Sequence, residues 1–338
     1  MTAATSSGDP QALLGVEDLV VEYTVHRLTV HAVSGVSFEI ARGETLGLVG
    51  ESGCGKSSLA RAVLRLAEPR AGRVRFDGHD LTAMRGEDLR RMRRHLQMVF
   101  QDPIASLNPR RRIADIVAEP LVIAGIADRA ERERRVAGAM LAVGLDPETA
   151  GTRRPHEFSG GQCQRVCIAR ALVLEPKLLV CDEPVSSLDV SIRAQILNLL
   201  EQMKARYGLT MLFVAHDLAV VKAVSDRIAV MYLGKLCEVA GAEDLFRAPL
   251  HPYTATLLAA IPVPDPDAPR APSVGFGEPP SPVSPPSGCR FRTRCARADA
   301  RCAHEVPVMR ELRRGHRVAC HHPLEPVTAS GPLGARLL

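Results

Sequence analysis

Apolar and polar residues alternate in two segments near the start of the chain. The segments LVVEYTV (residues 19–25) and VSGVSFEI (residues 33–40) carry β-branched side chains at alternating positions, which is the pattern of half-buried strands. The next run, ETLGLVG (residues 44–50), is short and apolar, and it predicts a buried strand that ends at a glycine-rich turn. The residues after this turn, KSSLARAVLRL, space their apolar side chains for one face of a helix.

Two later apolar runs, KLLVCDEP (residues 177–184) and TMLFVAHD (residues 210–217), predict further buried strands. Before them lies a helix-rich insert at residues 108–152, whose charged run DRAERERRVAGAM is typical of a solvated helix face. After residue 248 come proline-rich stretches, IPVPDPDAP and GEPPSPVSPPSG, which neither helices nor central strands tolerate. We therefore place a boundary near residue 248. The chain shows no internal repeat, so we expect one nucleotide core.

Composition narrows the class of protein. The chain has 338 residues, of which 46% are hydrophobic and 24% charged, as in globular proteins. No apolar run approaches the ~18 residues that span a bilayer, and the first residues, MTAATSSGDPQ, lack the features of a secretory signal. The net charge of +5 is compatible with several kinds of partner, nucleic acid included. Aromatic residues are only 4% and there is no Trp, which argues against base stacking, and we therefore do not expect nucleic acid as a partner. We expect a cytoplasmic protein that reaches a membrane only through partners.

The strongest motif is GESGCGKSS (residues 50–58), which fits the phosphate-binding loop G-x-x-x-x-G-K-[ST]. Its glycines let successive amides face phosphate, and the following helix directs its positive end at the same charge. We expect Lys56 to reach the β- and γ-phosphates of ATP and the Ser57 hydroxyl to hold Mg²⁺. The nucleotide-binding residues expected here are Gly50, Ser52, Gly53, Cys54, Gly55, Lys56, Ser57 and Ser58.

Four polar side chains that follow apolar runs complete a catalytic hypothesis. Asp182 suits a Mg²⁺ ligand, and the adjacent Glu183 suits a group that orients and polarises the attacking water. His216 is a candidate contact of the γ-phosphate, and Gln101 is a candidate bridge between Mg²⁺ and the attacking water. Structural roles are the alternative: acids that cap a strand end, and a histidine that only packs.

A second candidate phosphate site is FSGGQ, with Ser159, Gly160, Gly161 and Gln162 at the start of a predicted helix. The positive end of that helix could meet the γ-phosphate of an ATP already bound at a P-loop. Within one chain the two sites need not meet. In two chains packed head to tail, each FSGGQ could close over the other chain's P-loop, and we therefore expect a dimer that sandwiches ATP.

The motifs GESGCGKSS, FSGGQ, CDEPVSSLD and VAHD, in this order, resemble those of the ABC-type ATPases from about residue 14 to residue 237. The resemblance implies an α/β fold with a P-loop ABC-type ATPase core, in which a mixed sheet with helices is joined by an antiparallel β-subdomain and a helical subdomain. It also implies that Tyr23 stacks on adenine, that Ser186–Asp189 communicates across the dimer interface, and that Gln101 links the nucleotide to a partner touching the helical insert.

The resulting division of the chain has four parts. Residues 1–13 are expected to be disordered, and residues 14–247 to form the nucleotide-binding domain, with its helical subdomain at about 102–165. Residues 248–325 form a small Pro- and Cys-rich C-terminal extension, and residues 326–338 a tail.

A narrower resemblance, carried by VFQDPIASLNPR, GGQCQR, DEPVS and HPYT (residues 251–254), is to the ATP-binding subunits of bacterial dipeptide/oligopeptide importers, in particular the second ATPase subunit. It implies an ATP-hydrolysing subunit bound peripherally to the cytoplasmic face of the plasma membrane. The implied partners are two transmembrane permease subunits, a homologous ATPase subunit or a second copy of this chain and, through the complex, an extracytoplasmic peptide-binding protein. Dipeptides, oligopeptides, glutathione and nickel all remain open as cargo.

Two other classes compete with this one. Soluble ABC ATPases that act on ribosomes or DNA tend to carry two nucleotide cores or a long coiled-coil insert, and this chain has neither. A P-loop kinase or GTPase would leave FSGGQ and His216 unexplained.

The last fifth of the chain carries four cysteines, Cys289, Cys295, Cys302 and Cys320, separated by five, six and seventeen residues. Zinc sites usually contain a close C-x₂₋₄-C pair, which is missing here, and wider gaps suit an iron–sulfur cluster better. Zinc and free thiols remain open from the residues alone. The importer resemblance includes this cysteine pattern and implies a 4Fe–4S cluster. The nearby His304, His316, His321 and His322 are expected at the surface.

Overall fold

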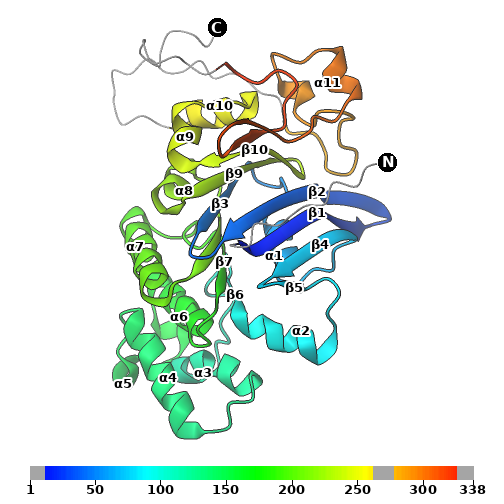
Figure 1. The fold of residues 1–338 in the computed structure, drawn as a ribbon. Coiled ribbons are helices and arrows are strands. Elements are labelled where there is room, and N and C mark those ends of the chain that lie inside the picture. Colours follow the sequence, from blue (N-terminus) through cyan, green and yellow to red (C-terminus); the bar gives the residue numbers. More distant parts are fainter. Residues whose placement is uncertain (1–11, 262–277, 326–338) are drawn as a thin grey trace, which may run out of the picture.

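An eight-stranded mixed sheet forms the centre of the computed structural model, which describes residues 12–261 and 278–325 (Figure 1). The strands follow one another across the sheet in the order β11-β12-β10-β9-β3-β8-β7-β6. Their bounds are β3 (Thr45–Val49), β6 (Leu96–Val99), β7 (Leu178–Asp182), β8 (Thr210–Val214), β9 (Arg227–Tyr232), β10 (Lys235–Gly241), β11 (Arg310–Arg313) and β12 (His316–Val318).

The strands β6, β7, β8, β3 and β9 run parallel to one another. All residues of β3, β7 and β8 are buried. Parallel strands covered on both faces require continuous apolar runs rather than alternation. This requirement explains why the runs at residues 44–50, 177–184 and 210–217 predicted strands correctly.

A second, antiparallel sheet lies beside the first in the order β2-β1-β4-β5 (Figure 1). Its strands are β1 (Ala12–Val25), β2 (Leu28–Ala41), β4 (Ala71–Phe76) and β5 (His79–Asp80). The helix α1 (Lys56–Val63) packs its buried residues into the apolar core that β1, β2 and β4 share with the main sheet. The alternating pattern at the start of the chain is confirmed as this antiparallel sheet.

The predicted helix-rich insert is confirmed as a helical subdomain that packs on α6 (Gly160–Leu172). It contains α3 (Ile113–Ile123), α4 (Arg129–Ala142) and α5 (Pro147–Ala150). The remaining helices and 3-10 turns are α2 (Gly86–Met92), η1 (Arg93–His95), η2 (Pro155–Glu157), α7 (Val190–Tyr207), α8 (Leu218–Val224), α9 (Ala242–Arg247), α10 (Pro252–Ala259), η3 (Arg292–Arg294) and α11 (Ala300–His304). In the described ranges we find no helix with the length and apolar character needed to cross a bilayer.

The C-terminal extension is joined to the core more closely than its composition suggests. Strand β12 pairs with β10, so the main sheet continues past the boundary predicted near residue 248. Tyr253 and Phe291 are buried in the same apolar core as the helical subdomain. The sequence analysis missed β11 and β12. Residues 12–13, which were expected to be disordered, are instead the start of β1. Residues 1–11, the stretch IPVPDPDAP after its first residue, and the tail at 326–338 lie outside the described residues.

A buried carboxylate anchors the extension to the sheet. Glu238 on β10 is fully buried, and it accepts hydrogen bonds from the backbone N–H groups of Leu250 and His251, at 2.6 and 2.9 Å. His316 Nε2 on β12 lies 2.6 Å from the same carboxylate. The prediction that His316 lies at the surface is therefore wrong: its side chain is 2% exposed, and its ring nitrogen contacts a buried acid.

We predict that Glu238→Gln destabilises the protein by about 2–4 kcal/mol, because an amide offers one acceptor oxygen where the carboxylate offers two. Urea unfolding at neutral pH measures the change. Glu243→Gln, which alters an exposed acid beside Lys222, is the matched control and should change stability by about 0.5 kcal/mol or less. Equal stability of the two variants would contradict the anchoring role.

Candidate active site

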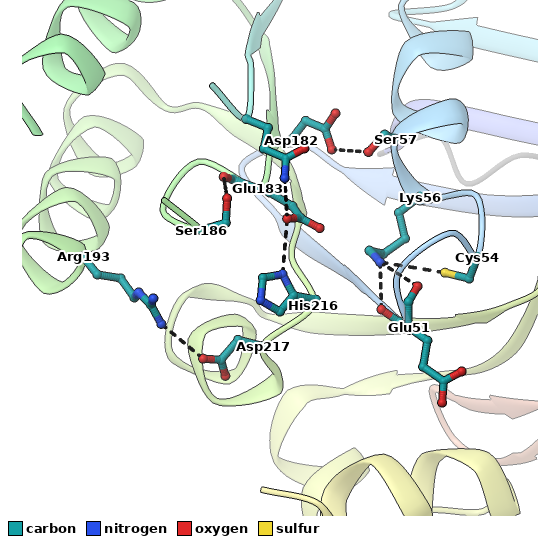
Figure 2. Close-up of polar contacts among 12 residues, drawn as sticks. Glu51, Cys54, Lys56, Ser57, Asp182, Glu183, Ser186, Arg193, His216 and Asp217 are labelled. Atoms are coloured by element: carbon teal, nitrogen blue, oxygen red, sulfur yellow. Dashed lines mark hydrogen bonds and ion pairs between the residues drawn. The ribbon is translucent and has the colours of Figure 1, made fainter. Parts of the chain in front are cut away.

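The candidate side chains gather where the parallel strands β3, β6, β7 and β8 end (Figure 2). The P-loop follows β3, Gln101 follows β6, Asp182 and Glu183 lie at the end of β7, and His216 follows β8. Parallel strands present their carboxyl ends at one edge, and ligands of open α/β sheets bind at that edge. The sheet therefore brings together residues that lie far apart in the chain.

The lysine of the P-loop hydrogen-bonds back to the start of the same loop. Lys56 is buried, and its Nζ donates to the carbonyl oxygens of Gly50 and Glu51, at 2.7 and 3.1 Å. Gly50 and Gly55 have φ of 154° and 106°, and a Cβ on either would lie about 2 Å from a backbone oxygen, of Met231 and Ala32 respectively. Only glycine fits these two positions. Ser52 and Gly53 are exposed at the turn of the loop, and Cys54 is buried beneath it.

A hydroxyl and a carboxylate meet at the start of α1. Ser57 Oγ donates to Asp182 Oδ1 at 2.8 Å. Asp182 is 2% exposed, and burial raises the pKa of its carboxyl in spite of the hydrogen bond from Ser57. A cation beside the pair would favour the ionised carboxylate again. Two oxygen donors in a partly buried setting fit Mg²⁺.

Glu183 lies between two side chains that the sequence analysis grouped with it. Gln101 Nε2 donates to Glu183 Oε2 at 3.1 Å, and His216 Nδ1 lies 3.2 Å from the same oxygen. The φ of Glu183 is 48°, an uncommon value for a residue with a side chain, and its N–H donates to Val214 O on β8 at 2.9 Å. The neighbouring strand therefore holds this carboxylate in a strained backbone conformation.

Several contacts that support this site were not predicted from the sequence. Ser186 Oγ donates to the carbonyl oxygen of Glu183 at 3.1 Å. Arg193 on α7 and Asp217, which caps α8, form an ion pair at 3.5 Å (Figure 2). The motifs DEPVSSLD and VAHD indicate that Ser186 and Asp217 lie near the phosphate-binding residues. Neither motif predicts which side chains these two residues contact.

The FSGGQ segment begins α6 in a self-capped state. Ser159 Oγ accepts from the backbone N–H of Gln162 at 3.3 Å, and Gln162 Oε1 accepts from the N–H of Ser159 at 3.0 Å. Both residues are exposed, while Gly161 is buried and a Cβ there would lie 2.5 Å from Ile192. The side chains that cap this helix start are therefore exposed, and among the described residues no hydrogen bond joins them to the P-loop of the same chain.

Tyr23 lies on β1 opposite Val30, half-buried against the smaller sheet. Ser58, on the first turn of α1, is also half-buried. Among the described residues, no hydrogen bond links either side chain to the catalytic group. Their expected roles toward nucleotide stay predictions.

The four clustered cysteines line one small pocket, together with Phe291 and three histidines. None of the four is in a disulfide, and burial raises the pKa of Cys320 to about 11. Among the described residues, only Asp299, Cys302 and His322 form a group of three ligand side chains whose donor atoms all lie within 4.8 Å. No three of the four thiols approach one another that closely. The four thiols therefore line the pocket but do not converge on a single point.

Two family models match the chain: the ABC transporter family at residues 33–186, and the C-terminal region of oligopeptide/dipeptide transporters at residues 237–302. A relative from Salmonella typhimurium, the oligopeptide transport ATP-binding protein OppF, is 50% identical, and the match covers 92% of this chain and 96% of the relative. OppF of Haemophilus influenzae is 48% identical over 94% and 98%. A dimeric ATP-binding cassette bound to ADP and Pi superposes with a TM-score of 0.62 at 28% identity, covering 68% of this chain and 98% of that one.

We predict that Glu183→Gln lowers ATP turnover by at least ~100-fold, because an amide cannot accept the proton of the attacking water. Nucleotide binding should persist, since Glu183 lies beyond the P-loop. Steady-state phosphate release and binding of a fluorescent ATP analogue measure the two quantities. Glu201→Gln, at an exposed position of α7, is the control. Wild-type turnover by Glu183→Gln would exclude Glu183 as the catalytic base.

Proposed function

This chain belongs to the ATP-binding subunits of the oligopeptide/dipeptide ABC importer family, and from that premise we propose that it hydrolyses ATP to drive peptide import through membrane permeases. The proposal rests on the active-site group and the C-terminal family match taken together. A complete P-loop, acid and histidine group lies at one sheet edge, in a chain whose C-terminal region matches that of peptide transporters. Neither half alone would indicate both the reaction and the cargo class.

In this proposal the P-loop amides and Lys56 bind the β- and γ-phosphates. Lys56 already lies buried beneath the loop, bonded to two of its carbonyl oxygens, so its charge is positioned before ATP arrives. Ser57 and Asp182 would hold Mg²⁺, with Gln101 nearby. The cation would neutralise charge on the phosphates during transfer.

Glu183 is the group that we assign to the attacking water. Its carboxylate is held by Gln101 and His216 through one oxygen, Oε2. That arrangement leaves the other oxygen available to orient water in line with the γ-phosphate. His216, which is half-exposed at 52%, would contact the γ-phosphate itself and so sense its departure.

The location of the second candidate phosphate site, at the start of α6, supports a dimer. Ser159 and Gln162 at the start of α6 are exposed, and their backbone N–H groups are capped only by each other's side chains. A partner chain placed head to tail would bring its P-loop to these amides. Ser159, Gly160, Gly161 and Gln162 would then bind the partner's γ-phosphate. The likeness to a dimeric cassette bound to ADP and Pi supports this arrangement.

The permease partners would bind the helical subdomain at the cytoplasmic face of the membrane. Ile104, Val122 and Ile123 are large apolar side chains that are more than half exposed there. The loop that begins at Gln101 includes Ile104, and it is tied to α6 by a hydrogen bond from Arg170 to Ser106 O at 2.6 Å. Movement of this loop would therefore carry the state of the nucleotide to the partner. A homologous ATPase or a second copy, and an extracytoplasmic peptide-binding protein, complete the proposed complex.

The cysteine-lined pocket fits an iron–sulfur cluster better than a single metal ion. A tetrahedral zinc with Zn–S bonds of ~2.3 Å requires thiolates roughly 4 Å apart, and no three of the four thiols lie within 4.8 Å of one another in the described residues. Cluster irons are separated, so their ligands are too. Cys289, Cys295, Cys302 and Cys320 would hold a 4Fe–4S cluster, which can accept or donate an electron or serve as a structural link.

We predict ATP-dependent uptake of labelled oligopeptides by proteoliposomes that contain this chain, its permeases and its ATPase partner, supplied with the peptide-binding protein. Lys56→Ala should abolish uptake, because the P-loop loses its phosphate-binding charge. Dipeptides, glutathione and nickel, tested in parallel, identify the cargo. An ATPase activity stimulated by ribosomes or DNA, with no uptake of any of these solutes, would favour the soluble alternative and reject the proposal.

We predict that protein purified without oxygen is brown and contains about four irons per chain. Metal analysis and the visible spectrum measure this content. Cys302→Ser should lose the iron, while Cys163→Ser, at a buried cysteine within α6, should keep it. Colourless protein with one zinc that is lost in His322→Gln but kept in Cys289→Ser would instead place a single ion at Asp299, Cys302 and His322.

A further inference from the structure

Glu51, the second residue of the P-loop, is held from outside the nucleotide-binding core. Its backbone N–H donates to the phenolic oxygen of Tyr253 at 2.9 Å. Its carboxylate accepts two hydrogen bonds from the guanidinium of Arg294, at 2.7 and 2.9 Å. Both partners belong to the C-terminal extension. Figure 2 shows the Glu51 carboxylate directed away from Lys56, whose Nζ contacts the backbone of the same residue.

The Arg294–Glu51 pair has the features of a strong interaction. The fork is bidentate, and the Arg294 side chain is 9% exposed. Its guanidinium lies 5.6 Å from the ring centre of Tyr232 and 6.0 Å from that of Phe291, and it also donates to the Tyr232 hydroxyl at 3.3 Å. A bidentate Arg–carboxylate pair that is shielded from water has shorter hydrogen bonds and a more fixed geometry than a typical surface ion pair, and its interaction is stronger.

Tyr253 is equally well held. It is fully buried, and its ring packs edge-on against Tyr232, with ring centres 4.7 Å apart. Phe291 packs against both tyrosines, at 5.3 and 5.2 Å. This aromatic cluster fixes the phenol that receives the Glu51 amide. The extension therefore restrains both the side chain and the backbone of one P-loop residue.

A P-loop benefits from such restraint because its glycines are costly to order. Gly50, Gly53 and Gly55 all have positive φ, and glycine loses more backbone freedom on ordering than any other residue. A loop already held in its phosphate-binding conformation loses less entropy when nucleotide binds. Glu51 lies between Gly50 and the exposed turn at Ser52, where a restraint acts on both.

We infer that Arg294 and Tyr253 are positioning residues for nucleotide binding, through which the C-terminal extension preorganises the P-loop at Glu51. The inference rests on ATP binding at this P-loop. It adds a role for the extension in the ATPase cycle that is separate from any cargo or metal.

The same contacts couple the nucleotide site to the cysteine-lined pocket. Arg294 directly precedes Cys295, and Arg290 directly follows Cys289. Arg290 donates to Leu233 O at 2.9 Å and to Ser34 Oγ at 3.1 Å. The segment between the two cysteines is thus tied to the core at both ends. Because coupling between sites is reciprocal, nucleotide binding should in turn order this segment.

The test compares Arg294→Gln with Arg301→Gln, which removes an arginine paired with Glu305 on the exposed surface of the same extension. We expect Arg294→Gln to weaken binding of a fluorescent ADP analogue, and to raise KM for ATP, by on the order of 10-fold, with kcat changed less than about twofold. Arg301→Gln should match the wild type. Arg294→Lys should fall between, since a lysine restores the charge without the fork.

A double variant separates positioning from a general loss of stability. If Arg294 acts through Glu51, Arg294→Gln combined with Glu51→Gln should bind nucleotide no more weakly than the worse single variant. Hydrogen–deuterium exchange adds an independent readout. ADP should slow exchange in residues 289–302 of the wild type and leave it unchanged in Arg294→Gln.

Less than about threefold weakening in Arg294→Gln, or fully additive effects in the double variant, would overturn the inference. Should Arg294→Gln fail to fold, as judged by thermal melting, Arg294→Lys decides by the same threshold. The variant Lys56→Ala distinguishes failure of this inference from failure of the proposed function. If the wild type binds nucleotide no better than Lys56→Ala, ATP binding at the P-loop is itself wrong, whatever the Arg294 variants do.

Discussion

The parallel alignment of β3, β8, β7 and β6 is the constraint on which the rest of the structure depends. Because neighbouring parallel strands end at one edge, the P-loop, Asp182, Glu183, Gln101 and His216 arrive at the same place. The hydrogen bond between Ser57 and Asp182 joins groups that lie 125 positions apart. A shift of β7 against β8 by one residue would turn Asp182 to the other face of the sheet. Continuous burial of both strands makes that shift costly.

The charged groups at this edge are placed in a way that favours a bound ligand rather than the stability of the protein alone. Asp182 and Glu183 are adjacent acids, and burial raises the pKa of Asp182 although Ser57 donates to it. Glu183 is held in a left-handed backbone conformation beside a histidine and an amide. The burial of the Asp182 carboxylate and the left-handed backbone at Glu183 each cost stability in the protein alone, and a bound cation would offset the first of these costs. Sites that break local rules in this way are where function is expected.

Sequence patterns predicted those parts of the structure that local chemistry determines. The buried strands, the P-loop, the paired acids and His216 each lie within a few residues of a readable apolar run, so the main-sheet edge could be assembled in advance. The contacts of the extension could not. Arg294 meets Glu51 across 243 positions, and His316 meets Glu238 across 78. A single arginine or histidine in a polar stretch carries no local signal of burial, and only the pairing of β12 with β10 reveals it.

The capping of α6 bears on the proposed dimer, because the same helix start would bind the partner's phosphate. Ser159 and Gln162 satisfy each other's backbone N–H groups in the resting chain, so two donors at the helix start already have acceptors. Capping of this kind contributes only about 1 kcal/mol. In the proposed dimer, a γ-phosphate bound to the partner's P-loop would offer these amides a stronger, charged acceptor. Closure would then be favoured while that phosphate is present, and the capping pair could re-form once it leaves. Because the cap contributes so little energy, the closed state would depend on the phosphate that hydrolysis removes.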